Sequence, residues 1–274
     1  MGRKQEFSEC GVKTWAKKNS VNYIEINSLK ENDLERVLEE LNKNKPEYGI
    51  VTDFSFIIPQ EIIDFFNKKL INIHFSLLPK YRGASPVQFA ILNGDGVTGI
   101  TYYIIDTKLD HGPILHQVGY NLTGNETSGE IYETLFKIAG EKLPEVLERY
   151  SQGNTTPLPQ DEQKATYTYS RSHPKNTYIY KEDAQIDWKD TSENIDRQVR
   201  AYNPWPISWT YLKDFEKAKN LTGGKMKFKD YIDKDLKVKI YKTDLEENKL
   251  RILEVQIEGK NKMDWKSFKN GYLV

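Results

Sequence analysis

The sequence contains little of what disulfide-stabilised, zinc-binding and membrane proteins require. Its 274 residues include one cysteine, Cys10, and four histidines. A single cysteine excludes an internal disulfide framework, and so few cysteines and histidines argue against a cysteine-rich zinc site. No stretch approaches the roughly 20 apolar residues of a membrane-spanning helix, and the opening Met-Gly-Arg-Lys leads into no signal-peptide core. We therefore expect a soluble, cytoplasmic, monomeric protein without a bound metal.

An excess of charge of one sign is also missing, because 40 lysines and arginines balance 40 aspartates and glutamates. This balance excludes a basic coat over the whole surface but allows a local basic patch. Residues 173–274 carry 21 basic and 17 acidic side chains, and residues 213–242 contain ten lysines against five acidic residues. Taken alone, a lysine-rich stretch is more often a solvated surface than a contact surface for nucleic acid, and both interpretations stay open.

Aromatic residues compensate for an apolar content of only 38%, because 17 tyrosines, 11 phenylalanines and 5 tryptophans supply bulky core side chains. In the first 152 residues, helical periodicity alternates with short apolar runs, which favours an α/β domain with a doubly wound, mostly parallel sheet. The expected helices cover residues 9–19, 30–43, 60–68, 85–93 and 127–150. The expected strands cover residues 23–26, 48–54, 70–75, 98–105 and 114–120, and the run 48–54 is expected to be buried.

The composition and the hydrophobic pattern of the sequence change after residue 152. Residues 153–172 carry two prolines among many polar residues, which is typical of a linker. Beyond them, one helix is expected over residues 186–203, and the short strands that follow favour a small β-barrel. These strands cover residues 208–212, 237–241, 251–258 and 271–274. We therefore expect a first domain at 1–152, a linker at 153–172 and a second domain at 173–274.

Three polar residues of the first domain form a candidate catalytic group. Asn72 and His74 are two positions apart on an expected strand, so their side chains leave the same face. At the carboxyl end of a parallel strand they would lie where open α/β sheets bind ligands. Asp110 lies 38 residues after Asn72, in a loop between two expected strands, and could reach the same crevice.

The chemistry of this trio fits acyl transfer to an amine, which brings its own nucleophile. An asparagine offers a fixed N–H donor to a carbonyl oxygen that gains charge. A histidine can pass a proton near neutral pH, and an aspartate can orient it and raise its basicity. Single histidines on strands are more often core residues, however, and asparagines near strand ends are often turn residues. Spacing alone therefore leaves the structural interpretation open.

The motif around this trio resembles the signature of the folate-dependent formyltransferases. Residues 72–86 read NIHFSLLPKYRGASP, and residues 98–101 (TGIT) and 109–114 (LDHGPI) continue the signature at the family's spacing. Residues 186–188 (IDW) and 200–206 (RAYNPWP) resemble the C-terminal domain of the methionyl-tRNA formyltransferases. The resemblance extends over nearly the whole chain.

The resemblance implies a reaction of translation initiation. A formyl group of 10-formyltetrahydrofolate would move to the amino group of methionine on initiator tRNA. Asn72 and His74 would hold the developing oxyanion, while Asp110 would tune His74 and relay protons. The second domain would be an OB-like barrel that binds tRNA. The residues implied to contact the folate form one segment: Ser76, Leu77, Leu78 and Pro79.

The sequence also departs from the family pattern. It starts at what looks like the basic loop after the family's first strand–helix–strand unit, so we expect an incomplete sheet, lower stability and reduced activity. His111 stands where a small or hydroxyl residue is usual, and DFSF at residues 53–56 replaces the usual Ala-Tyr-Gly pattern. Two alternatives stay open, namely a sugar-nucleotide N-formyltransferase and a catalytically inactive remnant that binds RNA. The lysines of 213–242 favour tRNA over a nucleotide sugar.

Overall fold

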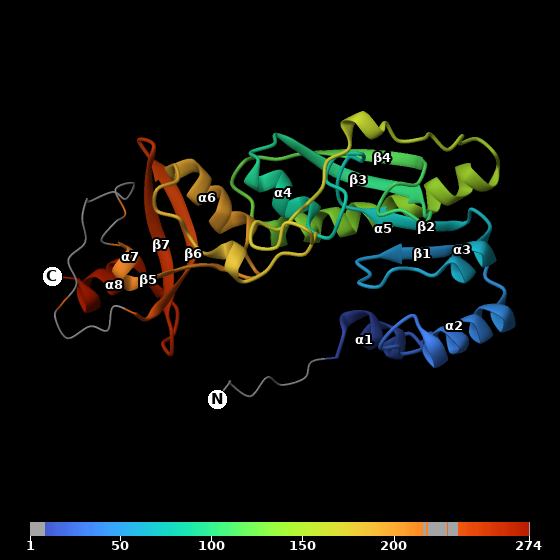
Figure 1. Ribbon diagram of the computed structural model, residues 1–274, viewed down its shortest axis with the longest axis horizontal. Helices are drawn as coiled ribbons and strands as arrows, with labels where there is room; N and C mark the ends of the chain where they lie inside the picture. Colours follow the sequence, from blue (N-terminus) through green and yellow to red (C-terminus); the bar gives the residue numbers. More distant parts are fainter. Residues whose placement is uncertain (1–8, 216–217, 219–228, 230–234, 274) are drawn as a thin grey trace. The chain divides into compact units, whose positions relative to one another are not determined.

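The computed structural model forms two compact units, whose helices and strands are labelled in Figure 1. The described residues are 9–215, 218, 229 and 235–273. The units comprise Met1–Gly49 with Phe54–Lys69, and Ile50–Asp53 with Leu70–Val274. None of the helices in these described ranges is long and apolar enough to cross a bilayer.

The first unit is built from helices. Its helices α1 (Gly11–Lys18), α2 (Glu31–Asn44) and α3 (Gln60–Phe66) match the predicted ranges to within two residues. The predicted strand at 23–26 is wrong, because these residues have irregular backbone and their apolar side chains are largely exposed. A run of four residues becomes a strand only where a neighbouring strand pairs with it.

The second unit begins with a four-stranded sheet in the order β1-β2-β3-β4. The strands are β1 (Gly49–Thr52), β2 (Leu70–His74), β3 (Val97–Ile104) and β4 (Ile114–Asn121). Helices and strands alternate as predicted, but β2 pairs antiparallel with β3, and β3 antiparallel with β4. The expectation of mostly parallel pairing is therefore wrong for these three strands. The chain between β2 and β3, which includes α4 (Pro86–Leu92), turns back at the end of β2 instead of crossing the sheet.

The strand predicted at 48–54 is shorter than expected and is not buried. β1 is the terminal strand of this sheet, and its side chains alternate between half-buried and exposed positions. Ile50, for example, remains 38% exposed. An apolar, β-branched run predicts a strand, but it does not distinguish the middle of a sheet from its edge.

The two faces of the first sheet have different chemistry. On one face the fully buried Tyr102 donates a hydrogen bond from its hydroxyl to the carbonyl of Ala139 at 2.8 Å. Ala139 belongs to α5 (Ser128–Ser151), which begins with a capping box at Thr127. Since Ile73 pairs with Tyr102 across the strands, this face is the apolar one. Alternation along β2 and β3 then places Asn72, His74 and Tyr103 on the opposite face.

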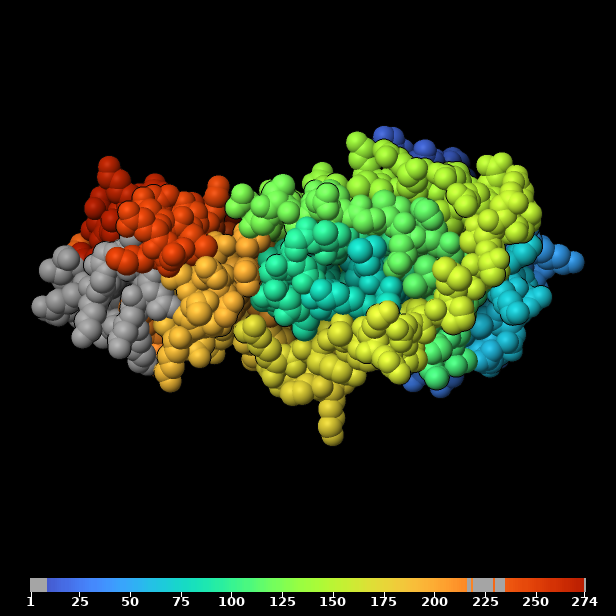
Figure 2. Space-filling view, turned by 90° about the horizontal axis from the view of Figure 1, so that it is seen from above, coloured from blue at the N-terminus to red at the C-terminus, as the bar shows by residue number. Residues whose placement is uncertain are grey.

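The segment predicted as a linker packs on the first sheet. Leu158 forms a β-bridge with Ile114 at the start of β4, and Tyr167 forms one with Arg82. Figure 2 shows this yellow-green segment lying along the green and teal surface of the preceding residues. Residues 153–172 are therefore ordered against the first sheet. The domain limits 1–152 and 173–274 stay predictions.

The C-terminal part of the second unit contains an antiparallel sheet in the order β5-β6-β7-β8. These strands are β5 (Ser208–Tyr211), β6 (Lys237–Glu246), β7 (Lys249–Ile257) and β8 (Met263–Asp264). Among the described residues, three helices join their apolar core, namely α6 (Ser192–Ala201), α7 (Leu212–Phe215) and α8 (Trp265–Tyr272). The short strands predicted at 208–212, 237–241 and 251–258 are thus present and pair antiparallel, while closure of the sheet into an OB-like barrel stays a prediction.

The last predicted strand, at residues 271–274, is wrong for its first two positions, and residue 274 lies outside the described residues. α8 (Trp265–Tyr272) covers its first two positions. Trp265 stacks on Phe268 at 4.7 Å between ring centroids, and Phe268 stacks on Tyr272 at 5.3 Å. This spacing of three and four residues is the helical period, so the apolar run at the end of the sequence continues a helix that buries Phe268 completely.

Candidate active site

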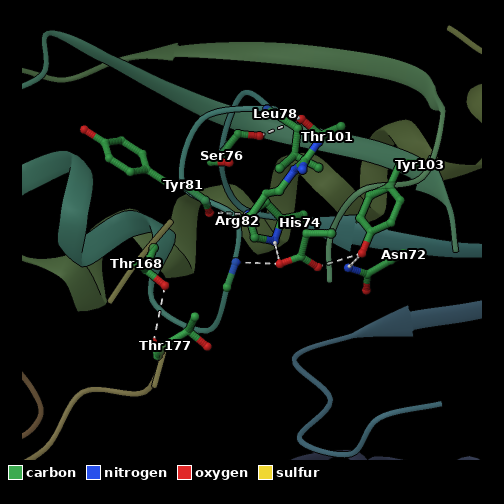
Figure 3. A network of polar contacts seen from close by, with 12 residues as sticks. Asn72, His74, Ser76, Leu78, Tyr81, Arg82, Thr101, Tyr103, Thr168 and Thr177 are labelled. Atoms are coloured by element: carbon green, nitrogen blue, oxygen red, sulfur yellow. Dashed lines mark hydrogen bonds and ion pairs between the residues drawn. The ribbon is translucent and has the colours of Figure 1, made fainter. Parts of the chain in front are cut away.

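Two antiparallel strands bring together the polar side chains of the candidate site. Asn72 lies directly opposite Tyr103 in the register of β2 and β3, and His74 lies opposite Thr101. Directly opposed residues share a face, as do residues two apart on one strand. The four side chains therefore form one polar patch on the face turned away from α5 (Figure 3).

Asp110 reaches this patch from the loop between β3 and β4. Its backbone has a φ of 46°, in the left-handed region, which aspartate tolerates better than most residues. One carboxylate oxygen, Oδ1, accepts a hydrogen bond from the Tyr103 hydroxyl at 2.7 Å. The other, Oδ2, accepts one from the backbone N–H of Gly83 at 2.6 Å and lies 3.7 Å from His74 Nδ1. The structure thus brings together Asn72, His74 and Asp110, with Tyr103 as the link between the first and the last.

The hydrogen bonds of His74 fix which ring nitrogen carries a proton. Nε2 lies 2.9 Å from the carbonyl oxygen of Tyr81. A carbonyl can only accept, so Nε2 must be the protonated nitrogen. Nδ1 is left to gain or lose a proton, and it faces the Asp110 carboxylate at a separation longer than a hydrogen bond. The side chain is only 6% exposed, so this nitrogen meets reactants inside the site.

The segment predicted to contact the folate is a tightly held loop. Thr101 Oγ1 donates to the carbonyl of Ser76 at 2.6 Å and accepts from the backbone N–H of Leu78 at 3.0 Å. The side chains of Ser76 and Leu78 are buried, whereas those of Leu77 and Pro79 are partly exposed. Side-chain contact with a ligand would therefore fall to Leu77 and Pro79, and the folate role of all four residues stays a prediction.

A buried arginine ties the predicted linker to the site, and sequence reasoning missed this role. Arg82 is 1% exposed and lies in a bidentate pair with the Glu162 carboxylate, at 2.6 and 3.1 Å. Its guanidinium also donates twice to Gln160 Oε1. The amide of Gln160 in turn donates to the carbonyls of Asp110 and Gly112. The loop that carries Asp110 is thus held from the segment 153–172.

His111 lies beside the ion pair between Arg82 and Glu162. Its Nδ1 lies 2.6 Å from the Asp106 carboxylate, and its Nε2 lies 3.4 Å from Glu162. A small or hydroxyl residue could not span these two carboxylates. The departure from the family pattern at this position therefore adds a contact between the Asp110 loop and the segment 153–172.

Alanine at Gly83 is expected to destabilise the chain and disturb the site. Gly83 has a φ of 116°, and an added Cβ would lie 2.5 Å from Thr168 Oγ1 and 2.7 Å from Thr177 Cβ. Backbone strain of this kind costs about 1–3 kcal/mol, and any shift of Gly83 moves the N–H that holds Asp110. We expect Gly83→Ala to lower the melting temperature in a thermal scan.

Gly140→Ala is the matched control, because a Cβ at that position of α5 has nothing within 4 Å. Alanine there should be neutral or stabilise the helix by up to about 1 kcal/mol. Equal melting temperatures for the Gly83 and Gly140 variants would contradict the strain argument.

Family comparisons divide the chain into two matched regions. Residues 3–147 match the family described as formyl transferase, and residues 178–273 match the C-terminal domain of formyl transferase. The first match covers more than half of the chain. The chain therefore belongs to the formyl transferase family, in agreement with the α/β domain and the following antiparallel sheet.

The curated relatives include several methionyl-tRNA formyltransferases. The protein of that name from Carboxydothermus hydrogenoformans is 35% identical over 278 residues, which cover 99% of this chain and 85% of the relative. The one from Legionella pneumophila (strain Corby) is 34% identical over 213 residues, covering 78% of this chain but only 64% of the relative. The alignment with this second relative thus spans less than two thirds of its length.

Solved structures of low identity share the fold. Methionyl-tRNA formyltransferase from Clostridium thermocellum superposes with a TM-score of 0.59 at 21% identity, over 89% of this chain and 91% of that one. HypX from Aquifex aeolicus in complex with tetrahydrofolic acid gives 0.61 at 17% identity, over 86% of this chain and 40% of its own. These likenesses support the fold class predicted from the sequence.

Proposed function

We propose that this chain transfers the formyl group of 10-formyltetrahydrofolate to the amino group of methionine on initiator tRNA. The observation that carries the proposal is the convergence of Asn72, His74 and Asp110 on one face of β2 and β3. Membership of the formyl transferase family supports the choice of reaction. The name of the relative that aligns with 99% of this chain, a methionyl-tRNA formyltransferase, supports the choice of acceptor. We place the reaction in the cytoplasm and expect the protein to act as a monomer without a metal.

The trio has a defined task in this reaction. The methionine nitrogen forms a bond to the formyl carbon, the bond from that carbon to N10 of the folate breaks, and a proton moves from the amine to N10. Asn72 Nδ2 and the His74 ring face the position where the formyl oxygen would gain negative charge. His74 Nδ1, next to Asp110, is the nitrogen that can take and return the proton.

The loop of residues 76–79 suits an aromatic co-substrate. Leu77 and Pro79 offer partly exposed apolar side chains beside the trio, while the hydrogen bonds of Thr101 keep the loop backbone fixed. An apolar surface with a few placed polar groups is the usual lining of a ligand site. We propose that the folate binds against this loop.

The second sheet offers a surface suited to RNA. Trp209 and Tyr211 on β5 lie opposite Lys239 and Lys237 on β6 in the strand register. Lys237 Nζ sits 4.3 Å from the centroid of the Trp209 ring. Aromatic rings and lysines on one face are the groups that nucleic-acid surfaces use for stacking and phosphate contacts. Of the lysine-rich stretch 213–242, residues 216–217, 219–228 and 230–234 lie outside the described residues.

Neutralising exposed lysines of β6 should weaken binding of tRNA and flatten its salt dependence. In Lys237→Gln, Lys239→Gln and Lys242→Gln combined, the slope of log affinity against log salt should fall by roughly 0.9 for each lost duplex phosphate contact. Formyl transfer at saturating tRNA should hardly change, because these side chains belong to the second sheet. Filter binding over a salt series measures the slope.

A control variant should carry the same loss of charge on another surface. Exposed lysines of the first domain and of the segment 153–172 serve this purpose: Lys137, Lys142 and Lys164. If replacing these lysines changed the slope of log affinity against log salt as much as the β6 variant does, the lysines of β6 would be interpreted as a solvated surface.

A direct assay tests the proposed function. Purified protein, 10-formyltetrahydrofolate and initiator tRNA charged with radiolabelled methionine should yield formylmethionyl-tRNA, separated by chromatography after deacylation. Uncharged tRNA, which lacks the acceptor amine, serves as the negative control, and an amino-sugar nucleotide serves as the competing acceptor. Formylation of the sugar amine but not of methionyl-tRNA would replace the proposal with the sugar-nucleotide alternative, and failure with both acceptors would favour the RNA-binding remnant.

A further inference from the structure

Tyr103 occupies a central place in the candidate site that the trio alone does not explain. Its hydroxyl accepts a hydrogen bond from Asn72 Nδ2 at 3.0 Å and donates one to Asp110 Oδ1 at 2.7 Å. The residue is 4% exposed, and Figure 3 shows its hydroxyl next to the side-chain amide of Asn72. Tyr103 therefore touches two of the three proposed catalytic side chains.

The direction of these hydrogen bonds can be deduced from chemistry. An ionised carboxylate only accepts, so the single O–H of Tyr103 must point at Asp110. The tyrosine oxygen then has lone pairs to offer but no second hydrogen. Only the Nδ2 side of the Asn72 amide can satisfy it, because a flipped amide would place Oδ1 against those lone pairs.

We propose that Tyr103 is a positioning residue of the formyl-transfer site. Its hydroxyl fixes the Asn72 amide with Nδ2 toward the reacting formyl oxygen, and it holds the Asp110 carboxylate toward His74. Within the described residues nothing else is bonded to Nδ2, so its second N–H is available to the oxyanion. This inference rests on the proposed function, and it adds a residue that the sequence motif does not contain.

Burial keeps the Tyr103 hydroxyl in its donor form. Burial first, and the negative charge of Asp110 second, raise the pKa of Tyr103 well above its ordinary range. The hydroxyl therefore remains protonated wherever the enzyme is folded and active. Removal of this hydroxyl should lower the formylation rate at every pH without adding a new inflection to the pH–rate profile.

Tyr103→Phe removes the hydroxyl and keeps the ring. Misplacing a reacting group by about an ångström can cost up to roughly a hundredfold in rate, so we expect kcat to fall by about 10- to 100-fold. The KM values for the folate and for methionyl-tRNA should change little, since the hydroxyl acts on catalytic groups. In an Asn72→Ala background the same change should cost much less, because the amide it positions is gone.

Tyr102→Phe is a matched control on the same strand. Tyr102 is as deeply buried, and its hydroxyl is also bonded, but to the Ala139 carbonyl on the opposite face. Both variants lose one buried hydrogen-bonding hydroxyl, so both should lose similar stability. A fall in kcat common to both variants would overturn the positioning role.

A second measurement does not depend on catalysis. The side-chain amide signals of Asn72 in a nitrogen–proton correlation spectrum can be assigned by their loss in Asn72→Ala. They should shift and exchange faster with solvent in Tyr103→Phe, and they should stay unchanged in Tyr102→Phe. An unchanged Asn72 amide in Tyr103→Phe overturns the inference, whereas a responsive amide in a protein that formylates no acceptor refutes the proposed function and leaves the positioning intact.

Discussion

Alanine at Asn72, His74 or Asp110 is expected to cut formyl transfer to methionyl-tRNA by at least about a hundredfold, the usual loss for an oxyanion donor or a general acid–base. Each side chain has a task that its neighbours cannot take over. Asn72 supplies the amide N–H, His74 supplies the nitrogen that can exchange a proton, and Asp110 is the carboxylate facing that nitrogen at 3.7 Å.

Single-turnover formylation with saturating folate donor measures this loss without interference from product release. His116→Ala is the control, because His116 lies in the same sheet but opposite Tyr102, on the face turned toward α5. It should retain most of the activity. Near-normal turnover by folded variants of Asn72, His74 or Asp110 would contradict the proposed mechanism.

The three alanine variants should differ in stability. Asp110 accepts hydrogen bonds from the Gly83 N–H and the Tyr103 hydroxyl, and its removal leaves both donors without an acceptor. A buried unsatisfied group costs about 1–3 kcal/mol, so Asp110→Ala should melt earlier than Asn72→Ala. Rates therefore have to be expressed per folded molecule, and Asp110→Asn, which keeps one accepting oxygen, separates the loss of charge from the loss of folding.

Local features of the sequence predicted most of the described elements and the shared face of Asn72 and His74. Helical periodicity placed α2, α4 and α5 to within two residues, because such periodicity is contained in a single segment. The spacing of two between Asn72 and His74 put both on one face, since strand alternation is also local. Asp110 could be placed near them only from its loop between two expected strands and from the resemblance, because no local spacing joins it to Asn72 and His74.

Contacts between distant segments could not be predicted in the same way. The pairing of Asn72 with Tyr103 spans 31 residues and depends on the antiparallel register of β2 and β3. The alternation of helices and strands had favoured parallel pairing, under which Tyr103 would not have been placed there. The pairing of Arg82 with Glu162 spans 80 residues and joins the site to a segment that looked like a free linker.

Arg82→Ala is expected to lower the free energy of unfolding by about 2–5 kcal/mol, the range for removing a large buried side chain. The guanidinium is 1% exposed, and its removal leaves a cavity as well as losing the bonds to Glu162 and Gln160. At about 2–4 °C per kcal/mol for a chain of this size, the melting temperature should fall by roughly 4–20 °C.

The loss should also reach the active site. Without Arg82, the hydrogen bonds that still hold the Gln160 side chain among the described residues are those from its Nε2 to the carbonyls of Asp110 and Gly112. Arg82→Lys keeps the charge but cannot form a bidentate pair with a carboxylate, so it should fall between the wild-type chain and Arg82→Ala in both stability and formylation rate.

The ion pair between Lys164 and Asp161 provides the comparison, because it lies in the same segment with side chains 77% and 48% exposed. Exposed pairs contribute about 0–1 kcal/mol, so Lys164→Ala should change neither the melting temperature nor the formylation rate measurably. Thermal melts followed by circular dichroism, with formylation measured on the same samples, test the two variants side by side. If Arg82→Ala melted at the same temperature as the wild-type chain, this arginine would not hold the segment 153–172. The Asp110 carboxylate would then be held by the Gly83 N–H and the Tyr103 hydroxyl without help from Arg82.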